Sequence, residues 1–314
     1  MPRYFLDVSR TISRLHHKVD TGIDRVERAY LTHLNTNYPD ALAVGVLGKE
    51  GFLCALPEFA KLLDSPLPAK PHLQDRVRLK LSDDQQRTKS LIRNHIGWDS
   101  ISNLQRTLKM KIQKEDLFIS VGHMRNTAAI ARVFLGCRAD VWYFIHDLIP
   151  MTHPDLVRSD TPEKFSDFID IVSSTATAVI CNSQTTASDV QKRGIHPEPI
   201  VARLGVELHP KTEETKARSG ALMVGTIEPR KNYDLILDLW LNDFKHPLPK
   251  LTIVGQRGWA APETFTKIDK LKAKGGVVEI GDASDEMLSD LYSSSEMLLF
   301  PSFAEFIFQN VCLE

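Results

Sequence analysis

One sequence feature constrains the fold of this chain most strongly. It is a short apolar run followed by a glycine turn, two adjacent cations and a helical pattern. The run at 221–224 is followed by Gly-Thr-Ile-Glu-Pro-Arg-Lys-Asn at 225–232, and residues 233–240 then show helical periodicity. Gly225 allows a tight backbone path, and Asn232 is a favourable N-cap residue. The pattern therefore predicts a strand, a turn and the start of a helix, which is the repeating unit of an α/β domain.

The two cations of this turn suit a phosphate group. Arg230 and Lys231 stand beside the predicted start of the helix. The partial positive charge of a helix N-terminus would add to theirs, so a phosphate or diphosphate could sit at this point. Arginine can hold phosphate through two parallel hydrogen bonds, and lysine adds a point charge. The alternative is a solvated basic turn at the end of a strand.

Short apolar runs alternate with helical patterns in both halves of the chain, which indicates parallel sheets. The runs lie at 4–8, 41–47, 116–121, 140–145, 176–181 and 198–202, and then at 221–224, 251–254, 277–280 and 297–300. The hydrophilic stretch 211–216 between the two series is predicted to be a linker. We therefore expect an α/β protein with two Rossmann-like domains, 1–207 and 217–314, that face a cleft.

The region 57–111 departs from this alternation. It contains several prolines and basic helical stretches, and it is predicted to be an insertion of helices and loops. A basic insertion beside a site could contact an acidic acceptor or a membrane surface. The other interpretation is a solvated helical face.

Polar residues and glycine directly follow three of the predicted strands of the first half. Gly122-His123, His146-Asp147 and Asn182-Ser183 take these places. Open α/β sheets bind their ligands at the carboxyl ends of the strands, so these residues are candidates for a site.

Composition and charge narrow the class of protein. The chain is 42% hydrophobic and 25% charged with a net charge of −1, so its charge gives no case for nucleic acid binding. The four cysteines show no CxxC pair and no metal-ligand spacing, which is typical of reduced thiols in the cytoplasm. The N-terminal apolar run is too short for a signal peptide, and no segment is long enough to span a bilayer. We expect a cytoplasmic protein, and peripheral contact with the inner face of the membrane stays open.

Several catalytic signatures are missing from the sequence. No Gly-x-Gly-x-x-Gly occurs, which argues against a dinucleotide-dependent oxidoreductase. No Gly-x-Ser-x-Gly occurs, which argues against a hydrolase with a serine nucleophile. There is also no Asp-x-Asp, so the metal clamp of many sugar transferases is not visible, and no metal or cofactor is expected.

The chain resembles glycosyltransferase family 4, also called glycosyltransferase group 1, whose members have the GT-B fold. The string at 225–232 is similar to the family's diphosphate-binding turn, and Thr-Gly-Ile-Asp-Arg-Val at 21–26 is similar to its N-terminal glycine loop. His-Asp-Leu-Ile-Pro at 146–150 looks like a motif of mannosyltransferases and related enzymes. Later landmarks of the family are matched by 182–184, 255–259 and 291–302, so the resemblance covers most of the chain apart from 57–111.

The resemblance implies a retaining transferase. It would move a hexose from a nucleotide-diphosphate sugar, with GDP-mannose suggested by the string at 146–150, to a glycan or lipid-linked acceptor in polysaccharide biosynthesis. Such a reaction needs charge stabilised on the leaving diphosphate. Arg230 and Lys231 are suited to this task and would take the place of a metal ion.

The resemblance also assigns roles to single residues. His146 would contact the donor sugar or its phosphate, Glu305 would bind the donor sugar, and both count with the two cations as catalytic candidates. Asp147 would bind the acceptor or simply cap a helix or turn. For His146 the alternative is a structural histidine at a strand end. The remaining donor-binding candidates are Gly22, Gly225, Thr226 and Glu314.

The C-terminal part departs from the family pattern. The family has two glutamates separated by seven residues, with Gly-Phe-Gly after the first; here eight residues separate Glu305 from Glu314, and Phe306 and Ile307 stand in the place of glycine. The family's terminal helices have no counterpart in the sequence, so the second domain is expected to be incomplete. An inactive remnant or a non-catalytic partner subunit that keeps the transferase fold is therefore the alternative function.

Overall fold

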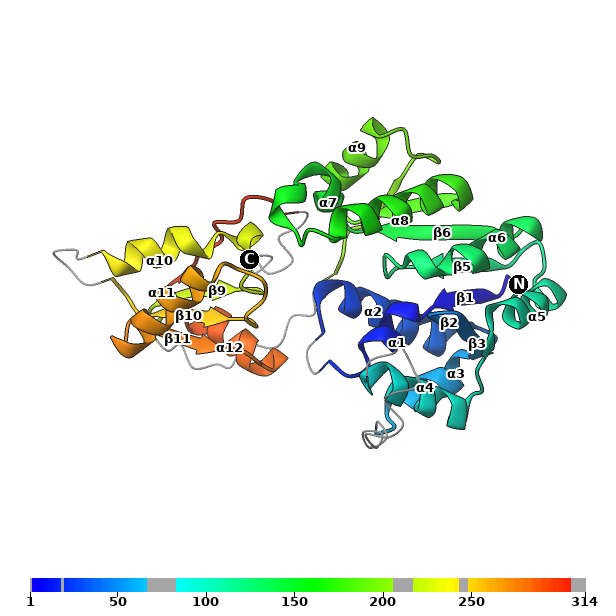
Figure 1. The fold of residues 1–314 in the computed structure, drawn as a ribbon, viewed down its shortest axis with the longest axis horizontal. Coiled ribbons are helices and arrows are strands. Elements are labelled where there is room, and N and C mark those ends of the chain that lie inside the picture. Colours follow the sequence, from blue (N-terminus) through cyan, green and yellow to red (C-terminus); the bar gives the residue numbers. More distant parts are fainter. Residues whose placement is uncertain (1, 18–19, 67–82, 206–216, 243–247, 306–314) are drawn as a thin grey trace. The chain divides into compact units, whose positions relative to one another are not determined.

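The computed structural model describes residues 2–17, 20–66, 83–205, 217–242 and 248–305. They form two compact units (Figure 1). The first unit contains the described residues up to 148 and the stretch 163–204; the second contains 149–162 and the described residues from 205 onward. The predicted linker at 211–216 lies outside the described residues.

The first unit is built around one sheet of eight strands in the order β4-β3-β2-β1-β5-β6-β7-β8. β1 lies in the middle and pairs in parallel with β2 on one side and β5 on the other, while β3 and β4 are antiparallel additions at one edge. The elements of this unit are β1 (Tyr4–Asp7), α1 (Ser9–Arg14), α2 (Gly22–Asn37), β2 (Leu42–Leu47), β3 (Glu50–Ala55), α3 (Leu56–Leu63), α4 (Asp83–His95), β4 (Asp99–Ser100), α5 (Ile101–Lys111), β5 (Leu117–Ser120), η2 (Arg125–Thr127), α6 (Ala128–Gly136), β6 (Asp140–Ile145), α8 (Thr161–Thr175), β7 (Ala178–Cys181), α9 (Gln184–Lys192) and β8 (Ile200–Val201).

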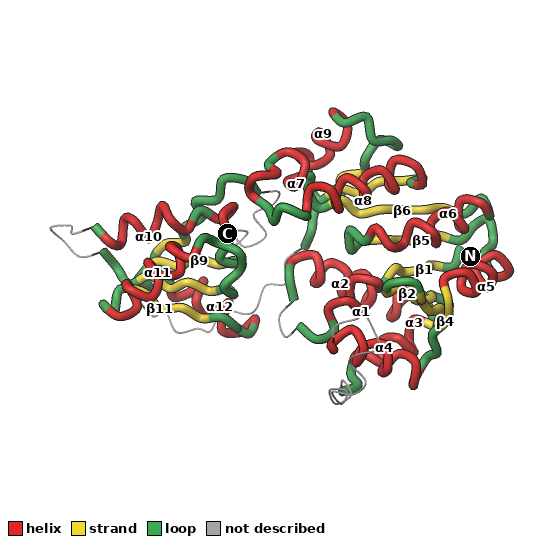
Figure 2. The backbone as a smooth tube through the Cα atoms, viewed as in Figure 1, coloured by secondary structure: helices red, strands yellow, loops and turns green. Residues whose placement is uncertain are grey.

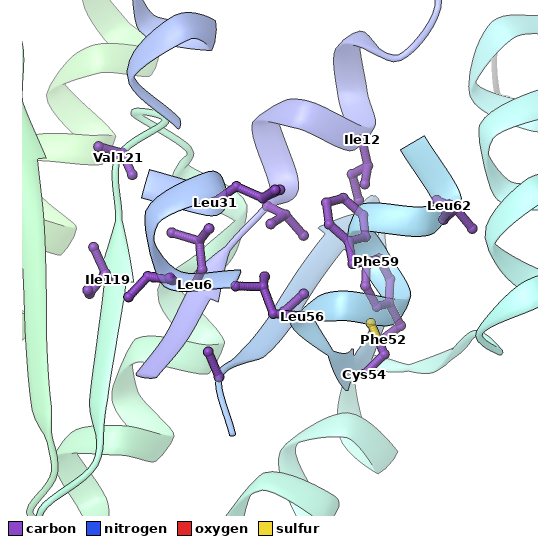
Figure 3. Close-up of a cluster of buried hydrophobic side chains, with 14 of the residues drawn as sticks. Leu6, Ile12, Leu31, Phe52, Cys54, Leu56, Phe59, Leu62, Ile119 and Val121 are labelled. Carbon is purple, nitrogen blue, oxygen red and sulfur yellow. The ribbon is translucent and has the colours of Figure 1, made fainter. Parts of the chain in front are cut away.

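A hydrophobic core joins this sheet to its helices. Leu6 of β1, Ile12 of α1, Leu31 of α2, Phe52 of β3 and Phe59 of α3 all belong to it (Figure 3). Fully burying a side chain of this size stabilises the fold by about 1.5–3 kcal/mol. The core thus fixes α1 and α2 against β1, and α2 begins within the predicted glycine loop at 21–26.

The region predicted as an insertion contains helices in its described part. Residues 57–111 include most of α3, together with α4, β4 and α5, and 67–82 lie outside the described residues. β4 pairs with β3, so this region also extends the sheet. Among the helices of the described residues, none is both long enough and apolar enough to cross a membrane.

The second unit has a smaller sheet of four parallel strands in the order β11-β10-β9-β12. Figure 2 shows strands of this sheet in yellow among the helices in red. Its elements are α7 (Ile149–Thr152), η3 (Pro154–Leu156), β9 (Ala221–Val224), η4 (Pro229–Lys231), α10 (Tyr233–Leu241), β10 (Leu251–Val254), α11 (Pro262–Ala273), β11 (Val277–Ile280), α12 (Asp285–Ser294) and β12 (Met297–Leu298). From β9 the chain adds β10 and β11 on one side and then returns to add β12 on the other. The carboxyl ends of β9 and β12 therefore form a switch point in the strand order, where sheets of this kind bind ligands.

Candidate functional site

The candidate site lies in the second unit, where the chain leaves β9 and β12. Gly225 follows β9 with φ +143°, a conformation that side chains rarely adopt. A Cβ atom at this position would lie 3.1 Å from Cε of Lys231. Glycine here lets the Lys231 side chain pass close to the backbone at the end of the strand.

The turn after Gly225 is held to the neighbouring strand end by backbone hydrogen bonds. The amide of Ile227 donates to the carbonyl of Gln256 at 2.9 Å, and the amide of Gly258 donates to the carbonyl of Ile227 at 3.1 Å. Ile227 is fully buried, and a Cβ atom on Gly258 would lie 2.6 Å from Cγ2 of Thr226. The backbone that leads to the two cations is therefore fixed before any ligand binds.

The predicted start of α10 is confirmed, and the Asn232 side chain has a different task from the expected one. Asn232 is the N-cap residue and has a left-handed backbone conformation, with φ +53°. Its side chain makes no capping bond to the helix and instead donates from Nδ2 to the carbonyl of Pro301 at 3.1 Å. Asparagine tolerates this conformation better than most residues. The residue thus ties the turn to the segment after β12.

Further bonds fasten the same two segments together. The amide of Phe303 donates to the carbonyl of Arg230 at 2.9 Å. Nη1 of Arg230 donates to the carbonyl of Ala304 at 2.9 Å. These bonds bring Glu305, distant in the sequence, against the two cations.

The core of the site is a cluster of charges formed by Glu228, Arg230, Lys231 and Glu305. Nη1 of Arg230 lies 2.8 Å from Oε1 of Glu305, and Nζ of Lys231 is bonded to the same oxygen. On its other side, Arg230 approaches Oε1 of Glu228 with Nη2 at 2.7 Å and with Nε at 3.0 Å. One carboxylate oxygen therefore lies between two cations, in a place that a phosphate oxygen could also take.

Burial shapes the charges of this cluster. The four side chains are between 6% and 14% exposed. Burial raises the pKa of Glu228 and lowers the pKa of Lys231 below its ordinary value. Burial also opposes the charge of Arg230, but the carboxylates of Glu305 and Glu228 outweigh it and raise the pKa of the guanidinium. Little water surrounds these charges, so an arriving anion would interact with them strongly.

The structure brings together residues that the sequence predicted for the donor, both for its diphosphate and for its sugar. Gly225, Arg230, Lys231 and Glu305 meet at this point. Thr226 lies in the same turn, with its methyl group packed towards Gly258. Glu314 lies outside the described residues.

Glu228 was not singled out as a site residue from the sequence. It is 5% exposed and binds Arg230 through one carboxylate oxygen. Its place inside the 225–232 string was the only available signal, and nothing in the pattern tells a buried partner of arginine from a solvated acid.

In the first unit, Gly22 is the first residue of α2, and this helix start already binds a carboxylate of its own. Thr21 and Asp24 form a capping box. Asp24 also pairs with Arg10 at 2.7 Å and with Arg14 at 2.8 Å. The glycine loop is thus ordered by a network of charges, and the predicted contact of Gly22 with a donor stays a prediction.

His146 follows β6 and is only 1% exposed. Its Nε2 lies 2.9 Å from the carbonyl of Val121, and since a carbonyl only accepts, this nitrogen carries the proton. Its backbone amide donates to Nε2 of His123 at 3.0 Å. Burial lowers the pKa of His146 to about 4, so the ring is neutral at pH 7. Asp147, which follows it, is half-buried, and the predicted roles of both residues remain predictions.

The buried ring of His146 should make the first unit sensitive to acid. The folded pKa of about 4 lies below the ordinary value of 6.5, so stability is full above pH 6.5 and is lost as the pH falls towards 4. The expected loss from this residue is about 3 kcal/mol. Urea unfolding of the wild type and of His146→Gln at pH 7.5 and pH 4.5 would measure it. The prediction would be contradicted if the free energies of unfolding of the two proteins differed by the same amount at both pH values.

Two buried carboxyl groups, Asp7 and Glu27, were also missed by the sequence analysis. Asp7 accepts a bond from Ser120 at 2.7 Å, and Oε1 of Glu27 accepts from the amide of Thr11 at 2.8 Å. Burial raises the pKa of Glu27 to about 8, so it is protonated at neutral pH. The sequence signal for a buried Glu27 was its place four residues after the apolar Ile23, on the same face of α2.

Comparison with known proteins relates the chain to sugar transferases. No protein-family model matches it. A curated relative, the serotype-specific mannosyltransferase WbdA of Escherichia coli, is 26% identical over 193 residues, which cover 52% of this chain and 23% of the relative. The matched part of the chain thus spans about a quarter of that protein's length.

Solved structures share the architecture. Anabaena Alr3699/HepE, solved in complex with UDP, aligns over 97% of this chain and 75% of its own with a TM-score of 0.59 and 14% identity. WaaG, a glycosyltransferase involved in lipopolysaccharide biosynthesis, aligns over 98% of this chain and 77% of its own with a TM-score of 0.54 and 14% identity. The predicted fold class is confirmed, because the chain shares the GT-B fold of these glycosyltransferases. The likeness to WbdA supports the resemblance to glycosyltransferases of the group 1 or family 4 kind.

Proposed function

We propose that the chain is a retaining glycosyltransferase that moves a hexose from a nucleotide-diphosphate sugar to a glycan or lipid-linked acceptor in polysaccharide biosynthesis. The observation that carries the proposal is the pair of buried cations, Arg230 and Lys231, at the carboxyl ends of β9 and β12. Contact with the inner face of a membrane, where a lipid-linked acceptor would lie, is part of the same proposal.

The chemistry of sugar transfer suits this arrangement. When the glycosidic bond to the diphosphate breaks, negative charge grows on the leaving oxygen. Fixed cations with little water around them stabilise such charge more than mobile ones do, because they need no reorganisation. Lys231 reaches the strand end beside Gly225, and its ammonium is free to exchange Glu305 for a phosphate oxygen.

Glu305 then has a second task in this proposal. Its carboxylate is bound to the cations in the structure described here, and a diphosphate in the same place would release it. The released carboxylate would accept hydrogen bonds from hydroxyl groups of the donor sugar. This agrees with the role that the family resemblance assigns to Glu305.

The identity of the donor is the finer part of the proposal. The relative WbdA is described as a mannosyltransferase, which favours a mannose donor such as GDP-mannose. The structural relative HepE was solved with UDP, so uridine nucleotides are the competing class. A panel that contains GDP, UDP, ADP and their sugars separates these cases.

We expect the transfer to proceed without a divalent metal ion. Arg230 and Lys231 provide the positive charge that a metal clamp would provide. Treatment with EDTA followed by desalting should therefore change donor turnover by less than about twofold. Restoration of lost activity by Mg²⁺ or Mn²⁺ would contradict this expectation.

The proposed function is tested by binding and turnover of the donor panel with the purified chain. A nucleotide-specific thermal shift that is lost in Lys231→Ala, together with release of nucleoside diphosphate when an acceptor is added, would support it. Binding without any release of nucleoside diphosphate would favour the alternative of a non-catalytic partner subunit. A folded chain that binds none of the nucleotides would refute the proposal.

A further inference from the structure

The ion cluster contains an acid that the proposed reaction does not use. Glu228 stands two residues before Arg230, with Pro229 between them. Its side chain is 6% exposed and bonded to Arg230, although a negative charge so close to a diphosphate site should oppose the ligand. The presence of this acid therefore needs an explanation that involves Arg230.

The position of Glu228 is fixed by the backbone around it. The preceding residue, Ile227, is paired with Arg257 across the end of β10. The carbonyl of Glu228 accepts a bond from the amide of Lys231 at 3.1 Å. Pro229 restricts the backbone between acid and arginine. The carboxylate is thus attached to a rigid turn and does not depend on Glu305 or on a ligand.

Glu305 holds the other side of Arg230 and is the partner that a ligand would replace. Oε1 of Glu305 is shared by Arg230 and Lys231. If a diphosphate takes this place, Arg230 keeps its bonds to Glu228, at 2.7 and 3.0 Å, and to the carbonyl of Ala304, at 2.9 Å. Those bonds use Nε, Nη2 and one hydrogen of Nη1, so the other hydrogen of Nη1 stays available to the anion.

We propose that Glu228 is a positioning residue for the diphosphate of the donor. It fixes the Arg230 guanidinium so that Nη1 and the Lys231 ammonium present one preformed place for a phosphate oxygen. The inference rests on the proposed function for the identity of the donor. The anion-binding arrangement itself can be tested without a nucleotide.

The experiment is a double-mutant cycle on Glu228 and Arg230, with inorganic pyrophosphate and the preferred nucleoside diphosphate as probes. Isothermal titration gives the dissociation constants of the wild type, Glu228→Ala, Arg230→Ala and the double variant. Glu228→Ala should weaken binding about tenfold, because Arg230 loses its fixed partner. The double variant should bind no more weakly than Arg230→Ala alone, since Glu228 acts through Arg230.

Glu228→Gln keeps the size of the side chain and an oxygen that can accept from Nε and Nη2. It should bind within about threefold of the wild type, which a variant with a collapsed turn would not do. Near-UV circular dichroism confirms that each variant is folded. If Glu228→Ala does not fold, Glu228→Met and Glu228→Met/Arg230→Ala supply the cycle, because methionine fills a similar space but offers no oxygen to the guanidinium.

Two results would overturn the inference. Tighter binding in Glu228→Ala or Glu228→Gln would mean that the acid merely repels the ligand. If the increases in dissociation constant caused by Glu228→Ala and Arg230→Ala multiply in the double variant, the two residues act independently. A cycle that behaves as expected with pyrophosphate, in a protein that binds no nucleoside diphosphate, would keep the role of Glu228 and reject the proposed function.

Discussion

Lys231→Ala is expected to reduce turnover of the donor roughly 100- to 1,000-fold, the range seen when one fixed donor to a developing negative charge is removed. The Lys231 ammonium is bonded to Glu305, and its stem passes beside Gly225. Alanine leaves no cation at this place. Arg230 cannot compensate, because its guanidinium is held by Glu228 and by the carbonyl of Ala304.

A matched control separates this effect from a general change of charge. Lys267 lies in the same unit and is also bonded to carboxylates, those of Asp234 at 2.9 Å and Asp238 at 2.7 Å, but its side chain is 27% exposed. Lys267→Ala should leave donor turnover within about twofold, since exposed ion pairs contribute little. Equal losses in the two variants would show that Lys231 has no special role at the diphosphate.

The pH dependence gives an independent view of the same ammonium. Burial lowers the pKa of Lys231 below the ordinary value of 10.5. The lysine is charged below its folded pKa, so turnover should decline on the alkaline side before pH 10.5 is reached. Lys231→Arg should shift this decline to higher pH, because arginine stays charged. An alkaline limb of unchanged position in Lys231→Arg would assign the titration to another group.

The turn at 225–232, which would bind the donor and is here called the donor turn, could be predicted from the sequence. Its local structure depends on residues that are adjacent in the chain. A glycine, two cations and a helical pattern follow the apolar run in order, and β9, η4 and α10 appear at these positions. The meeting of Lys231 with Glu305 joins residues 74 positions apart. The residues alone do not fix such a contact, and only the resemblance to a family indicated it.

Other features depend on tertiary packing and could not be foreseen. The strand β3 at Glu50–Ala55 was not predicted, because Glu50 and Gly51 break its apolar pattern. Its pairing with β2, which the sequence pattern does not show, stabilises the strand. The polar residue His146 looked available to a ligand in the sequence, yet neighbouring elements leave it 1% exposed. The pattern of a sequence shows where a strand ends, and packing decides whether the next side chain reaches solvent.

Gly255→Ala is expected to destabilise the second unit by about 4 kcal/mol, through strain in the backbone and overpacking together. Gly255 follows β10 with φ +154°. A Cβ atom there would lie 2.0 Å from the carbonyl oxygen of Gly225 and 2.5 Å from its carbon. The atoms it meets belong to the backbone, so the ends of β9 and β10 must move apart.

The movement would also affect the donor turn. The carbonyl of Gly225 accepts a bond from the hydroxyl of Tyr233 at 2.7 Å, and the amide of Gly225 donates to the carbonyl of Val254 at 2.8 Å. Displacing this peptide shifts the strand end that Lys231 passes. Gly255→Ala should therefore lose donor binding even under conditions where the second unit remains folded.

Alanine variants at two other glycines of the same unit distinguish the cost of backbone strain from the cost of overpacking. A Cβ atom on Gly275, with φ +76°, or on Gly281 would meet nothing within 4 Å. Gly275→Ala should cost about 1–2 kcal/mol from its backbone conformation alone, and Gly281→Ala should be close to neutral. Urea unfolding followed by tryptophan fluorescence measures all three variants. If Gly255→Ala is as stable as Gly275→Ala, the ends of β9 and β10 do not approach each other closely in solution. The donor turn would then lack the backbone support described above.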